Sequence, residues 1–134
     1  MSPRMTHICL HVKDVDECTR FYKDYCKLQT IDERINEGEG SVYMSEVGRQ
    51  AEIVFQLKSG GNNLTLATDE ERHFGFVVKS RQAVDDIAKR AREDGILFFE
   101  PEEYLPGAYM CGVKDPNGNC VEFSYGHSVP PITG

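Results

Sequence analysis

The stretch HICLHVK at residues 7–13 returns in altered form as HFGFVVK at residues 73–79. Both copies begin with a histidine and end on a valine–lysine pair, and the offset between them is a constant 66 residues. A second matched pair follows, because Glu52 lies in the segment AEIVF and Glu122 lies in the segment VEFSY, at an offset of 70 residues. We therefore interpret the chain as two related halves that differ by a short insertion.

Each half has the pattern of a strand, a helix and three further strands. In the first half, alternation of apolar and polar residues predicts a strand at 5–12, and Asp14 can cap a helix that runs to about Lys27. Its further strands are predicted at 29–36, 41–47 and 50–57. The second half repeats this order, with a strand at 73–79, a helix between Ser80 and Gly95, extended segments at 96–100, 108–114 and 119–125, and a loop at 101–107.

Neither half contains enough apolar surface on both sides of its sheet to bury that sheet alone. The predicted fold class is therefore α+β, with paired βαβββ modules that form a sheet cleft. The modules span about residues 5–58 and 73–126, and a polar, glycine-containing linker joins them at 59–72. We expect both modules to belong to a single domain of residues 1–134.

Composition limits the classes of partner. The formal net charge of −7 argues against nucleic acid and anionic membranes, both of which bind basic surfaces. The sequence has no secretory signal and no apolar run long enough to span a membrane, so a cytoplasmic protein with a small-molecule substrate is expected. Five cysteines without CxxC spacing fit reduced thiols rather than a disulfide framework.

Four residues form the candidate site, and they are His7, Glu52, His73 and Glu122. Taken singly, each fits a solvated residue on the open face of a sheet. Strand alternation, however, places every one of them opposite an apolar face, and the two halves repeat the same pair. Two imidazoles and two carboxylates are a common ligand set for a divalent metal ion, and together they neutralise its charge. The matched pairs therefore predict one shared metal site.

Several motifs resemble the glyoxalase I branch of the vicinal oxygen chelate superfamily, over residues 5–126. They are THI at 6–8, RFY at 20–22, AEIV at 51–54, HFGF at 73–76 and DPNGNCVE at 115–122. The last of these, a turn that leads into a strand containing glutamate, is typical of the superfamily and only moderately specific for one activity. The resemblance implies paired βαβββ modules, as in the glyoxalase, bleomycin resistance and dioxygenase proteins.

The resemblance also implies an activity, that of a lactoylglutathione lyase-like carbon–sulfur lyase. Such an enzyme isomerises the hemithioacetal of methylglyoxal and a thiol of the glutathione type through a metal-stabilised enediolate. Glu122 and Glu52 would share the roles of metal ligand and catalytic base. One divalent ion per site is expected, with nickel, cobalt or zinc favoured and iron or manganese compatible. Relatives are commonly homodimers, and the site can lie within one chain or be shared between two.

One position departs from the glyoxalase I pattern, which usually has an arginine four residues after the first ligand histidine. Here that position is His11, a candidate substrate-binding residue that is mostly neutral near pH 7. Other activities of the superfamily therefore stay open. They are an epimerase, a fosfomycin-type thiol transferase, an extradiol dioxygenase and a drug-binding resistance protein.

Overall fold

The computed structural model describes residues 2–60 and 73–127. By its contacts the chain divides into two compact units, Met1–Leu64 and Thr65–Gly134. Most of the predicted linker at 59–72 lies outside the described residues. No helix in the described part of the chain is long and apolar enough to cross a membrane.

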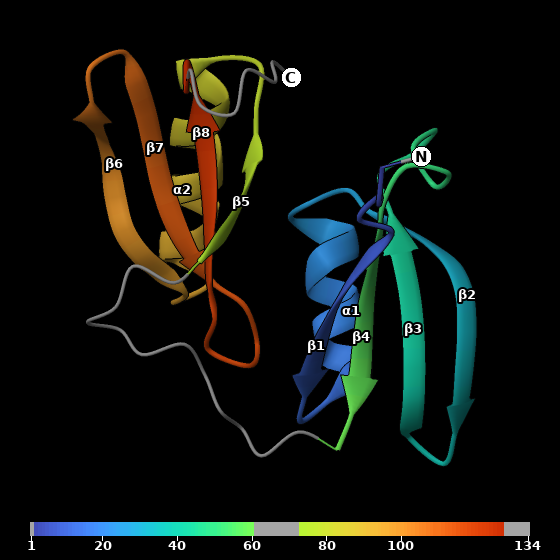
Figure 1. Ribbon diagram of the computed structural model, residues 1–134. Helices are drawn as coiled ribbons and strands as arrows, with labels where there is room; N and C mark the ends of the chain where they lie inside the picture. Colours follow the sequence, from blue (N-terminus) through green and yellow to red (C-terminus); the bar gives the residue numbers. More distant parts are fainter. Residues whose placement is uncertain (1, 61–72, 128–134) are drawn as a thin grey trace. The chain divides into compact units, whose positions relative to one another are not determined.

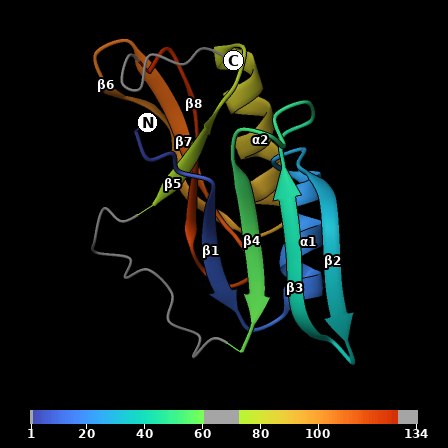
Figure 2. The ribbon, with the colours of Figure 1, turned by 45° about the vertical axis from the view of Figure 1, so that its right-hand side comes forward.

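The first unit is a four-stranded sheet with a helix on one face (Figure 1). Its elements are β1 (His7–Val12), α1 (Val15–Asp24), β2 (Gln29–Asn36), β3 (Glu39–Ser45) and β4 (Val54–Ser59). The strand order is β1-β4-β3-β2, in which β1 runs parallel to β4 and the other neighbours are antiparallel. Figure 2 shows the four strands side by side with α1 behind them.

The second unit repeats this arrangement. Its elements are β5 (Phe74–Val77), α2 (Arg81–Glu93), β6 (Leu97–Leu105), β7 (Ala108–Lys114) and β8 (Cys120–Tyr125). The strand order is β5-β8-β7-β6, and β5 runs parallel to β8, as β1 runs parallel to β4 in the first unit. The predicted pair of βαβββ modules is confirmed.

Capping and apolar stripes explain both helices. The Asp14 side chain accepts a hydrogen bond from the backbone N–H of Glu17 at 3.0 Å, and Ser80 caps α2 in the same way. Each helix then buries one stripe against its own sheet. The buried residues are Val15, Cys18, Phe21 and Tyr22 in α1, and Val84, Ala88 and Ala91 in α2. On the sheet side, Tyr22 meets the edge of Phe55 with ring centroids 4.9 Å apart.

Several predicted boundaries differ from the observed ones, and two of the differences have a clear physical reason. The segment 101–107, expected as a loop, belongs largely to β6, which continues to Leu105. This strand lies at the edge of its sheet and pairs irregularly with β7, so it tolerates Pro101, which has no N–H to donate. The strand expected at 50–57 begins only at Val54, because the N–H groups of Glu52 and Ile53 turn back to the carbonyl of Arg49.

The turn between β7 and β8 is held by a buried carboxylate. Asp115 has only 3% of its surface exposed and accepts hydrogen bonds from the N–H groups of Asn117 and Asn119 at 2.9 and 2.8 Å. The side-chain amide of Asn119 donates a further bond to Asp115, at 3.3 Å. This turn fixes the β7–β8 register, in which Gly112 lies opposite Glu122.

We predict that Asp115→Ala lowers the free energy of unfolding by about 3 kcal/mol, because buried backbone donors lose a charged acceptor. Ser80→Ala removes a cap with one such bond and should cost about 1 kcal/mol. Urea denaturation followed by circular dichroism measures both changes. Equal losses for the two variants would contradict the role given to Asp115.

Candidate functional site

In both sheets the face away from the helix carries the polar candidates. In the first unit, Phe55 contacts α1 and Leu57 is fully buried, so the intervening Gln56 lies on the opposite face. In the second unit, Val121 and Phe123 are buried, and Glu122 lies on the face away from α2. These helix-free faces are where the site is built.

His73 and Glu122 lie together in the second unit. The Nε2 atom of His73 is 3.4 Å from Oε2 of Glu122, and the two side chains are 40% and 14% exposed. His73 directly precedes β5, and the parallel pairing of β5 with β8 brings it beside Glu122. Two ligand atoms that are each about 2.1 Å from one ion lie about 3 Å apart at a right angle. The pair therefore fits two ligands of one metal ion.

Neither unit by itself holds a complete metal site among its described residues. Across 2–60 and 73–127, no group of three or more His, Cys, Asp or Glu side chains is gathered closely enough to hold an ion. His7 begins β1 in the first unit, exposed, with its Nδ1 atom 2.9 Å from the hydroxyl of Thr6. His73 and Glu122 are thus the candidate ligands that the structure brings together.

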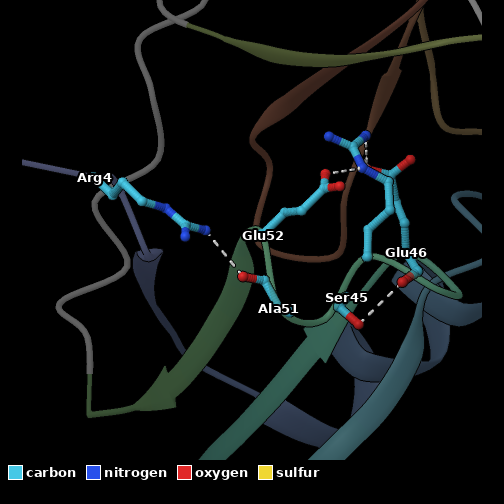
Figure 3. A network of polar contacts seen from close by, with 6 residues as sticks. Arg4, Ser45, Glu46, Ala51 and Glu52 are labelled. Atoms are coloured by element: carbon cyan, nitrogen blue, oxygen red, sulfur yellow. Dashed lines mark hydrogen bonds and ion pairs between the residues drawn. The ribbon is translucent and has the colours of Figure 1, made fainter.

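Glu52 lies outside β4, in the turn that precedes it, and this corrects its predicted place on a strand. Its carboxylate is 58% exposed and accepts a hydrogen bond from Nε of Arg49 at 2.6 Å (Figure 3). The same guanidinium binds Glu46 at 2.8 Å, and Glu52 and then Glu46 raise the pKa of Arg49. Glu52 is therefore part of a surface ion-pair network.

Strand register identifies Gln56 as the counterpart of Glu122. In the second unit Glu122 lies opposite Gly75, and in the first unit Gln56 lies opposite Cys9. Cys9 and Gly75 are 66 residues apart in the sequence, and so are Gln56 and Glu122. The same offset of 66 relates the two histidines. The offset of 70 between the glutamates therefore matched Glu52, a turn residue, with Glu122, a residue of β8. Applying the constant offset to Glu122 would have found Gln56 from the sequence.

The Gln56 amide points along the sheet toward β3. Its Nε2 atom donates to the hydroxyl of Ser41 at 3.2 Å and to Oη of Tyr43 at 3.3 Å. Gln56 has no ionisable group, whereas Glu122 has one. The first unit therefore has a hydrogen-bonded amide at the place where the second unit has a carboxylate.

His11 belongs to a row of polar residues that crosses the first sheet. The register places it opposite Lys58, which lies opposite Ser41, which in turn lies opposite Arg34. Directly paired residues point to the same face, so all four side chains share the helix-free face. Arg34 is bound to Asp32 at 3.0 Å. Lys58 adds a positive charge beside His11.

Burial makes two thiols poor nucleophiles. Cys111 is buried beneath α2, where its Sγ atom is 3.8 Å from the carbonyl of Val84, and burial raises the pKa of its thiol to about 12. Burial, followed by the charge of Glu122, raises the pKa of Cys120 to about 11. Neither cysteine supplies a thiolate near pH 7.

A model of the Glyoxalase/Bleomycin resistance protein/Dioxygenase superfamily matches residues 4–123. A protein of Pseudomonas aeruginosa, described as uncharacterized protein PA2024, is 45% identical over 132 residues, which cover 98% of this chain and 94% of that protein.

Solved structures show the same fold. A structure described as a possible glyoxalase from Bacillus cereus is 26% identical, with a TM-score of 0.70, and the match covers 92% of this chain and 100% of that one. The fosfomycin resistance protein FosX of Listeria monocytogenes, as a mutant complexed with Mn(II) and dihydroxypropylphosphonic acid, matches with a TM-score of 0.73. It is 17% identical, and the match covers 98% of each chain.

We predict that the stability of the protein falls as the pH rises above about 9, in part through Cys111. The folded pKa of this thiol is about 12 against an ordinary value of 9.0, so the folded state holds the proton more tightly. The stabilisation is complete below pH 9 and is lost as the pH approaches 12. Urea midpoints between pH 8 and 11 measure the slope. Cys111→Ala should reduce this slope, and an unchanged slope would contradict the assignment.

Proposed function

Since the chain belongs to the Glyoxalase/Bleomycin resistance protein/Dioxygenase superfamily, we propose that it is a metal-dependent enzyme with His7, His73 and Glu122 as metal ligands. The 3.4 Å approach of His73 to Glu122 is the observation that carries this proposal. Two imidazoles and one carboxylate are a ligand set for divalent ions such as nickel, cobalt, zinc, iron and manganese. Glu52, predicted as a fourth ligand, has no support from the strand register, and the proposal leaves it out.

A bound divalent ion would polarise substrate oxygens as a Lewis acid. Around it, the protein would supply positioning and proton transfer. The carboxylate of Glu122 is mostly shielded from water, at 14% exposure, and it is the residue we assign as catalytic base. Gln56, held by Ser41 and Tyr43, is unable to take a proton and would serve to orient the substrate.

For the reaction, we propose the glyoxalase I-like isomerisation of a hemithioacetal formed from methylglyoxal and a thiol. Glu122 would take the proton from the carbon next to the carbonyl and return it to the neighbouring carbon, and the product is a thioester. The row containing His11 and Lys58 supports a thiol that carries a carboxylate, such as glutathione, because the lysine can pair with that group. The similarity to a structure described as a possible glyoxalase agrees with this choice.

A second candidate is favoured by Gln56. Glyoxalase I-like sites have a carboxylate where this chain has an amide, so a site with one carboxylate also fits a fosfomycin-type thiol transferase. In that reaction the thiolate of the thiol substrate would attack an epoxide carbon, the C–O bond of the ring would break, and the released oxygen would take up a proton. The likeness to FosX extends over nearly the whole chain, although at 17% identity it concerns the fold alone. We propose a homodimer in either case, as expected from the family resemblance.

We predict that the protein loaded with one of the five metals converts methylglyoxal and glutathione to the thioester. Glu122→Gln keeps an oxygen ligand and loses the base, so kcat should fall by about 10²-fold or more, and metal affinity should fall less. Glu93→Gln, an exposed substitution on α2, is the matched control and should leave kcat unchanged. Absorbance of the thioester measures the rate. Absence of turnover with every metal would reject the hemithioacetal, and loss of fosfomycin would then be assayed.

Measurements of metal affinity distinguish the two positions, 52 and 56, that could supply a fourth metal ligand. We predict that Gln56→Glu raises Mn²⁺ or Ni²⁺ affinity by about tenfold or more, because it adds a carboxylate at the counterpart of Glu122. Glu52→Gln should leave the affinity unchanged, because that carboxylate is bound to Arg49. Isothermal titration calorimetry measures both. If Glu52→Gln greatly lowered the metal affinity and Gln56→Glu did not raise it, Glu52 would again be the candidate fourth ligand.

A further inference from the structure

We propose that Gly75 is a positioning residue that allows the carboxylate of Glu122 to reach His73. Gly75 lies on β5 directly opposite Glu122, two residues after His73. The absence of a side chain at this point leaves the space in which the Glu122 side chain lies. The consequence for metal binding depends on the proposed function, whereas the steric relation between Gly75 and Glu122 does not.

The contacts around Gly75 show that a side chain at this position would crowd Glu122. A Cβ atom added there would lie 3.0 Å from Oε2 of Glu122, 3.1 Å from its carbonyl oxygen and 3.2 Å from its Cβ atom. The carboxylate can rotate away from such a contact, but the carbonyl oxygen and Cβ are fixed by the strand. The φ angle of Gly75 is not positive, so the backbone does not require glycine at this position. Space is therefore the reason for glycine here.

The other neighbour of Glu122 leaves no such space. Gly112 lies opposite Glu122 on β7, and a Cβ atom added to Gly112 would clash with the ring of Phe99. The Phe99 ring therefore covers Gly112 on the face that carries Glu122. The space beside Glu122 is filled by the Phe99 ring on the side of β7 and is free of a side chain at Gly75 on the side of β5. The carboxylate lies on the side of β5, near His73.

The first unit shows the opposite arrangement with different residues. The counterpart of Gly75 is Cys9, which has a side chain, and the counterpart of Glu122 is Gln56. Tyr43 lies opposite Gln56 on β3, at the place that Gly112 has in the second unit, and it receives the amide of Gln56. The side chain at this position thus points toward β3 in the first unit and toward β5 in the second.

A graded substitution at Gly75 tests the proposal. Valine suits a strand, so a loss in Gly75→Val comes from its side-chain atoms and not from its strand propensity. We expect Gly75→Val to lower Mn²⁺ affinity by about tenfold or more, and Gly75→Ala to lower it less. Cys9→Val, the matched substitution in the first unit, should have little effect. Electron paramagnetic resonance of free Mn²⁺ measures the affinities.

A double-mutant cycle tests the steric relation without metal. In metal-free protein, Gly75→Val should lower the urea midpoint, and the loss should be smaller when Glu122→Ala has removed the side chain that valine displaces. The matched cycle of Cys9→Val with Gln56→Ala should show no such coupling, because the Gln56 amide lies toward β3. Circular dichroism measures each midpoint.

The two measurements keep the proposals apart. Absence of binding of Mn²⁺ and of the other four metals by the wild-type protein would reject the proposed function, and the double-mutant cycle would still decide the role of Gly75. Coupling between residues 75 and 122, together with weaker Mn²⁺ binding where the wild type binds, is the expected result. If Gly75→Val lowered the urea midpoint equally in the presence and in the absence of the Glu122 side chain, the inference would be overturned, whatever the metal affinity.

Discussion

Each unit depends on the parallel pairing of its first and last strands, β1 with β4 and β5 with β8. Two parallel neighbours cannot be joined by a tight turn, so the chain must cross over the sheet between them, and here it does so through a helix and two further strands. The helix covers one face and buries the apolar side of the strands. The other face keeps the polar residues. His73 and Glu122, far apart in sequence, become neighbours through this pairing.

The two halves use the same scaffold for different local chemistry. Gln56 and Glu122 occupy equivalent places, but an amide bound by two hydroxyls differs from a carboxylate beside an imidazole. Their neighbours differ accordingly, with Tyr43 in one half at the place of Gly112 in the other. Duplication therefore preserved the backbone register and left the side chains on the helix-free face free to diverge.

The sequence predicted what depends on periodicity and on turns. Alternation gave β1 and the face of His7, the helices followed from their caps and apolar stripes, and the buried turn at Asp115 followed from its DPNGN motif. The superfamily resemblance is confirmed. The strand expected to contain Glu52 begins only at Val54, and the cause of this error is physical, because a matching residue type was taken for a matching register. The role of Gly75 depends on contacts across strands, which no local pattern encodes.

The charge of the proposed ligand set bears on the substrate. With one carboxylate instead of two, a divalent ion held by His7, His73 and Glu122 would keep a net positive charge, since neutral imidazoles cancel none of it. Such a site favours substrates that present anionic oxygens. The row that contains Lys58 and His11 adds positive charge on the helix-free face of the first unit, within a chain whose net charge is −7. Gln56, by replacing a carboxylate, thus points to an anionic substrate more strongly than a four-ligand site would.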